Sequence, residues 1–121
     1  MLRPATGTPA TAASRTIGTT NSAVTYSLPL WRGASGNTWR VAHIVSGANT
    51  PLSVVVSGRD VTVNVATNGS SVATSTATQV AAAVNANTAL QDKGFVATAG
   101  GTGAGVVVAG AIANLTGGAG A

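Results

Sequence analysis

Apolar and polar residues alternate most regularly between Leu52 and Thr67, LSVVVSGRDVTVNVAT. Alternate positions on both sides of a central turn are Leu or Val, which is typical of two strands with one buried face. Gly58-Arg59 between them fits a two-residue type II′ loop, in which glycine comes first. Such a loop would place Val56 opposite Val61 and keep the alternating apolar side chains on one face. The stretch therefore predicts a β-hairpin.

The same alternation predicts strands before and after the hairpin. Asn21 to Leu30 has Val24, Tyr26 and Leu28 on its apolar face. Trp39 to Val45 carries apolar residues on both faces, which favours a central strand. Further short strands are predicted at Phe95–Ala99, Val106–Ala109 and Ala111–Leu115, with a turn at Gln91–Gly94.

Between the hairpin and these last strands the period changes from two to about 3.6. Thr76 and Gln79 form the pattern of a capping box, which predicts the start of a helix. Its apolar stripe would consist of small residues three and four apart. These are Ala77, Val80, Ala81 and Val84. The whole order of elements predicts an α+β fold, a mostly antiparallel β-sheet domain with one helix packed on it.

The first twenty residues show no period. Met1 to Thr20 is rich in Thr, Ala, Pro and Gly, and Pro4 and Pro9 exclude a helix there. We expect an extended N-terminal arm at residues 1–20, a β-rich α+β domain at 21–118 and a flexible C-terminal end at 119–121.

Charge is scarce in this chain. Charged residues make up 7% of it, against about 25% in an ordinary soluble domain. The net charge of +4 comes from cations that are scattered singly, with no basic run and few aromatic residues. This pattern argues against nucleic acid as a partner. We expect no membrane contact either, because no apolar run reaches the length of a membrane span.

Residues for catalysis or metal binding are also few. The chain has no Cys, one His and two acidic residues, both Asp. This set argues against a Zn²⁺ or Ca²⁺ site and against paired catalytic carboxylates, so we expect no enzyme, no cofactor and no metal. His43 is predicted to be a partly buried strand residue, although a trimer could bring three copies of it to one axis. The glycines of GGTGAG at 100–105 resemble a phosphate loop only superficially, because the Lys-Ser/Thr is missing.

The two tryptophans flank a glycine-containing loop. Trp39 is predicted to lie in the core, and Trp31, in the loop, at an interface. Together with Tyr26 they could instead form a platform for a sugar or a cell-surface ligand.

Five segments in order resemble a module of tailed-bacteriophage virion proteins. They are an opening strand at Asn21–Tyr26, a turn and strand at Gly33–Val41, the hairpin at Leu52–Thr67, the capped helix at Thr76–Asn85 and a closing LTGG at Leu115–Gly118. Such modules are structural, on capsid surfaces and in tails. The resemblance implies a capsid decoration, or cement, protein on the virion surface, assembled in the host cytoplasm. It implies a homotrimer, with the major capsid protein as its other partner.

Five residues are predicted to lie at the interface on this interpretation. They are Arg3 and Arg15 in the arm, Trp31 and Arg32 in the loop, and Arg59 at the hairpin tip. A tail tube or fibre component is the main alternative function. A carbohydrate or cell-surface binding module is a further one.

Overall fold

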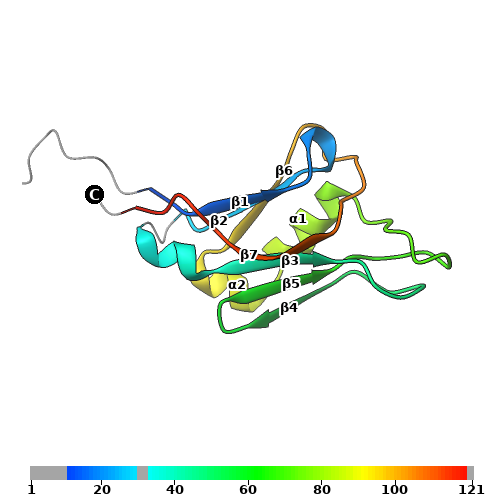
Figure 1. Ribbon diagram of the computed structural model, residues 1–121, viewed down its shortest axis with the longest axis horizontal. Helices are drawn as coiled ribbons and strands as arrows, with labels where there is room; N and C mark the ends of the chain where they lie inside the picture. The colour runs from blue at the N-terminus through cyan, green and yellow to red at the C-terminus, as the bar shows by residue number, and fades with distance from the viewer. Residues whose placement is uncertain (1–10, 30–32, 120–121) are drawn as a thin grey trace, which may run out of the picture.

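The computed structural model describes residues 11–29 and 33–119, and over this part of the chain it has the predicted α+β fold (Figure 1). An antiparallel sheet has the strand order β1-β2-β6, and a mixed sheet has the order β4-β5-β3-β7. The strands are β1 (Ser14–Ile17), β2 (Val24–Ser27), β3 (Arg40–Ile44), β4 (Ser53–Ser57), β5 (Asp60–Asn64), β6 (Val96–Ala99) and β7 (Gly110–Asn114).

The β4–β5 hairpin has the register that its sequence predicts. Val56 pairs with Val61, and the closing pair Ser57–Asp60 leaves a two-residue loop. Gly58 has a φ of +61°, while Arg59 is not among the residues with positive φ, as a type II′ turn requires. The hairpin prediction is therefore confirmed.

Strand β3 is central in its sheet, as the apolar residues on both its faces predict. It pairs with β5 in parallel and with β7 antiparallel. The hairpin folds back so that β5 lies between β4 and β3. The β3–β5 pair is therefore a parallel pair in a mostly antiparallel fold.

Helix α1 (Ala77–Asn85) begins with the predicted capping box. Oγ1 of Thr76 accepts a hydrogen bond from the backbone N–H of Gln79 (3.3 Å), and Oε1 of Gln79 accepts one from the backbone N–H of Thr76 (3.0 Å). Its buried residues are the four of the predicted stripe, Ala77, Val80, Ala81 and Val84. They pack the helix mainly against β6.

A second short helix, α2 (Thr88–Lys93), occupies the place where a turn was expected. Oδ1 of Asn87 caps it by accepting from the N–H of Leu90 (3.2 Å), and Gly94 ends it with a φ of +73°. Two 3₁₀ turns complete the helical elements of the described chain, η1 (Thr20–Ser22) and η2 (Ala34–Thr38).

The boundary between arm and domain, expected at residue 20, lies earlier. Strand β1 falls within the expected arm and pairs with β2 over its full length, because Ile17 and Ala13 contribute to the core. Residues 1–10 of the arm lie outside the described residues.

The C-terminal segment also differs from the prediction. No strand forms at 106–109, where the chain makes a single bridge from Val106 to Thr76. Strand β7 overlaps the last predicted strand, Ala111–Leu115, and begins and ends one residue earlier. The chain then leaves β3 and bridges to the start of β1 and the residues before it, through the pairs 14–116 and 11–119. Ala119, expected in a flexible end, is thus paired, and the segment joins the two sheets.

One apolar core fills the space enclosed by the two sheets and α1. Its aromatic centre is a chain of three rings, with Trp39 5.5 Å from Phe95 and Phe95 5.8 Å from Tyr26, measured between centroids. The expected burial of Trp39 is confirmed, since 1% of it is exposed. The rest of the core is mainly Val, Leu and Ala.

Candidate functional site

The two sheets present outer faces of different chemistry. On the three-stranded sheet, Thr16, Thr25 and Thr98 form a row of paired hydroxyl residues, and Oγ1 of Thr16 lies 2.8 Å from Oγ1 of Thr25. On the four-stranded sheet, the matching central row is Val55, Thr62 and Ala42, and β7 adds the exposed Ile112 where its register against β3 shifts. The second face is the more apolar of the two.

This apolar face, called the outer face below, consists of three rows of residues. The middle row is Val55, Thr62 and Ala42, of which Ala42 is buried, and Ile112 lies on β7 at the register shift. The row toward the hairpin tip is Ser57, Asp60, Arg40 and Asn114, and the row at the other end is Ser53, Asn64 and Ile44. Val55 is 52% exposed, Ile112 42% and Ile44 39%. The helices pack on the opposite side, where the buried valines lie, so no helix of the described chain covers the outer face. This uncovered face with exposed branched apolar side chains is therefore a candidate protein-binding surface.

An ion pair borders the outer face on the side of the hairpin tip. Arg40 donates to both carboxylate oxygens of Asp60, from Nε (2.8 Å) and from Nη2 (2.7 Å). The bond from Arg40 lowers the pKa of Asp60, and the same bond raises the pKa of Arg40. The two residues are cross-strand partners, so the parallel β3–β5 register brings them together. The two side chains neutralise each other's charge, and their two hydrogen bonds hold them in one arrangement at the hairpin-tip row of the outer face.

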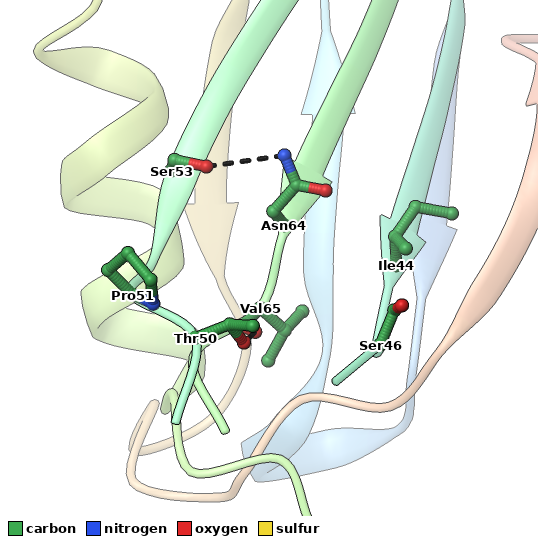
Figure 2. Close-up of a pocket in the computed structure, with 7 residues that line it drawn as sticks. All are labelled: Ile44, Ser46, Thr50, Pro51, Ser53, Asn64 and Val65. Carbon is green, nitrogen blue, oxygen red and sulfur yellow. Dashed lines mark hydrogen bonds between the residues drawn. The ribbon is translucent and has the colours of Figure 1, made fainter. Parts of the chain in front are cut away.

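A cleft opens at the other end of the outer face (Figure 2). Its volume is about 310 Å³. Oγ1 of Thr50 lies 2.7 Å from Oγ1 of Thr67, and Nδ2 of Asn64 donates to Oγ of Ser53 (3.2 Å), so these polar groups are already bonded within the chain. The lining is uncharged and suits an apolar side chain of a partner. It comprises Ile44, Ser46, Thr50, Pro51, Ser53, Asn64 and Val65.

The predicted interface residues do not gather at one place. Arg59 is exposed at the hairpin tip, and its Nη1 donates to Oγ1 of Thr38. Arg15, half-buried in β1, donates from Nη1 to the carbonyl of Val41, so its guanidinium contacts its own chain. Arg3, Trp31 and Arg32 lie outside the described residues. Periodicity predicted the strands of the outer face, but the parallel pairing that assembles it has no local sequence signal.

The only histidine of the sequence is held inside the core. Nε2 of His43 lies 2.5 Å from the hydroxyl of Tyr26, and Nδ1 lies 3.0 Å from the carbonyl of Val108. Because a carbonyl only accepts, Nδ1 carries the proton and the Tyr26 hydroxyl donates to Nε2. Burial lowers the pKa of His43 and raises that of Tyr26, and the charge of Arg15 lowers both. With 1% of it exposed and both nitrogens bonded, His43 is not placed to meet other copies at a trimer axis.

The buried rings also bear on the expected ligand platform. Tyr26 is fully buried and Trp39 nearly so, which removes two of the three aromatic residues from any surface for sugar binding. The third, Trp31, lies outside the described residues.

The glycine-rich loop at 100–105 serves α1 and not a phosphate. The carbonyls of Gly105 and Gly103 accept from the N–H groups of Ala77 and Thr78, both at 3.0 Å. An anion bound at the N-terminus of α1 would need these two N–H groups, but the loop already occupies them. A Cβ on Gly103 would lie 2.1 Å from Oγ1 of Thr78, so glycine is required by this close approach. The superficial likeness to a phosphate loop therefore has a structural explanation.

Over residues 11–29 and 33–119, no group of three or more His, Cys, Asp or Glu side chains could hold a metal ion. Within the same ranges, no helix is both long and apolar enough to cross a membrane. A scan against protein-family models and searches of curated proteins and of solved structures found no match to this chain.

Proposed function

We propose that this chain is a structural protein of a tailed-phage virion, a capsid decoration protein that binds the outer surface of the head. The observation that carries the proposal is the outer face of the four-stranded sheet. It exposes Val55, Ile112 and Ile44, and at its border Arg40 and Asp60 neutralise each other's charge. Such a surface gains free energy by covering a protein surface, since about 25 cal/mol is gained per Å² of apolar area buried.

The proposed partners are the major capsid protein and further copies of the chain as a homotrimer. Arg59 at the hairpin tip is a proposed contact beside the outer face, because its exposed guanidinium can bond a carboxylate or carbonyl of a neighbour. A tail tube or fibre component is the second proposed function, and it would use the same face in rings or rods in place of a shell.

The test is co-sedimentation of the purified chain with heads of the phage that carries it, stripped of their outer proteins. We expect saturable binding that Ile112→Lys weakens by about tenfold or more, because a buried lysine is costly at an apolar contact. Val72→Lys is the matched control, since Val72 is 56% exposed and lies in a loop that is not part of the four-stranded sheet. Arg59→Ala is expected to weaken binding less.

Electron microscopy of the same particles distinguishes the two proposed functions. A regular pattern on the shell supports a decoration protein, whereas rings or rods of the chain support the tail alternative. Failure of the wild-type chain to bind heads, or equal binding by Ile112→Lys, overturns the head-binding proposal.

A further inference from the structure

The two sheets have four edges, and three of them are closed. Asn85 covers the edge of β6, donating from Nδ2 to the carbonyl of Ala97 (2.8 Å) and accepting at Oδ1 from its N–H (2.9 Å). The C-terminal segment covers the start of β1 through the bridge from Thr116 to Ser14, and it covers Thr11, before the strand, through the bridge to Ala119. Strand β7 contains a bulge against β3 and then leaves the sheet. Each device prevents further strand pairing.

Strand β4 has no such protection among the described residues. It ends the order β4-β5-β3-β7, and in Figure 1 no ribbon lies beyond it at the lower margin of the sheet. Its sequence, Ser-Val-Val-Val-Ser, contains no charge, proline or glycine, and its five residues pair with β5 without a bulge. This is the composition of a strand that accepts a neighbour.

The hairpin register identifies which main-chain groups of β4 face outward. Ser57 and Asp60 close a two-residue loop and form a hydrogen-bonded pair, so Val56 opposite Val61 is a non-bonded pair and Val55 opposite Thr62 is a bonded one. The N–H and C=O groups of Val54 and Val56 therefore point away from β5 toward the open edge.

The sequence of β4 reads the same in both directions about Val55. We propose that β4 pairs antiparallel with β4 of a second copy of this chain, around a two-fold axis at Val55. Ser53 then faces Ser57 of the second copy, and Val54 faces Val56. Because the outward groups belong to Val54 and Val56, this register forms about four main-chain hydrogen bonds and leaves the two Val55 residues as a non-bonded pair.

Charge does not oppose this contact although each chain carries +4. The cation nearest in sequence to β4 is Arg59, four residues from Val55. The two-fold axis sends the two Arg59 residues to opposite ends of the strand pair, roughly 26 Å apart at about 3.3 Å per residue. That separation exceeds the Debye length of about 8 Å at physiological salt.

The paired strands also extend the outer face. Val55 ends the middle row at β4, so the row Ala42, Thr62, Val55 continues into the same row of the second copy. The two-fold operator makes the contact closed, which limits it to a pair and does not propagate into a fibre. This contact goes beyond the proposed function, because it is expected of the purified chain without any capsid, whereas the homotrimer is proposed for the chain bound to a head.

Cysteine cross-linking tests the register directly, because the chain has no cysteine of its own. In a non-bonded antiparallel pair, opposite Cβ atoms lie about 4.5–5.5 Å apart, within small adjustment of a disulfide. We expect Val55→Cys to form a disulfide-linked dimer on mild oxidation, with twice the 11.6 kDa mass of one chain. Ser53→Cys and Ser57→Cys alone should not cross-link, while their mixture should yield the mixed disulfide-linked dimer.

The matched control is Val72→Cys, equally exposed but in a loop. Sedimentation of the unmodified chain over a concentration series should show a reversible dimer, and Val55→Lys should raise its dissociation constant by about tenfold or more through like charges at the axis. Circular dichroism of each variant establishes that it is folded.

The proposal is overturned if folded Val55→Cys does not cross-link, or if Ser53→Cys or Val72→Cys cross-links as fast. A chain that stays monomeric at every concentration also overturns it, and then β4 would receive a strand of another protein. A trimer that Val55→Lys leaves intact would likewise exclude this contact while leaving the proposed decoration function standing, since head binding is measured separately.

Discussion

The single buried histidine predicts a specific loss of stability in mild acid. Burial lowers the pKa of His43 in the folded chain, whereas the unfolded chain protonates it at a pKa of about 6.5. Below that pH the unfolded state binds one more proton than the folded state, so the free energy of unfolding falls as the pH falls. The contribution of neutral His43 to the free energy of unfolding is therefore present above a pH of about 6.5 and is lost below it.

The magnitude follows from one proton. Stability should fall by up to about 1.4 kcal/mol per pH unit, which amounts to about 2 kcal/mol between pH 7 and pH 5 as long as folded His43 stays neutral. Domains of this size have about 5–15 kcal/mol in total, so the loss is readily measured. The chain has no Glu, and the hydrogen bond from Arg40 lowers the pKa of Asp60.

Urea unfolding at a series of pH values, followed by circular dichroism, measures this effect. With a slope of about 1–3 kcal/mol per M for urea, the midpoint should shift by about 1 M between pH 7 and pH 5. His43→Gln removes the titrating group, so it should be less stable at pH 7 but should show no such shift. A flat profile in the wild type, or an unchanged shift in His43→Gln, would refute the reasoning.

Two further predictions concern single residues in the loops and at a sheet edge. Ser71 has a φ of +62°, so Ser71→Gly should raise the free energy of unfolding by about 0.5–1 kcal/mol in urea titrations. Ser70 has no positive φ, so Ser70→Gly should not raise it. A lower free energy of unfolding in Ser71→Gly would contradict the prediction. Asn85→Ala removes both hydrogen bonds to Ala97 and should cost about 1–3 kcal/mol, with faster amide hydrogen exchange at residue 97; unchanged exchange there would show that the side chain does not hold the edge of β6.

The sequence predicts best those elements whose partners are close in the chain. The hairpin register follows from Gly58 and the alternating valines, and the start of α1 follows from the pair Thr76 and Gln79. In both cases the determining contacts span a few residues, so local geometry decides them.

The outer face could not be predicted in the same way. Alternation marks Val55 and Ala42 as strand residues but does not say which strands are neighbours, and the insertion of β5 between β4 and β3 depends on packing of the whole core. Strand β1 was not predicted because the alternation at Ser14–Ile17 is too short. The apolar run Val106–Ala109 was predicted to be a strand, but it instead buries Val107 and places the Val108 carbonyl at His43. The phage resemblance and the five predicted interface residues stay predictions.

The segment that leaves β3 to pair with β1 determines when this chain can fold. Thr11 and Ala119 exchange main-chain hydrogen bonds, and Leu115 is fully buried in the core. Contacts between such distant residues close a loop of nearly the whole chain, which slows folding. During synthesis, Ser14 at the start of β1 and Thr11 before it must wait for their partners until Thr116 and Ala119 have emerged from the ribosome. Folding of this domain is therefore completed after translation of its last strand, and not progressively as the chain grows.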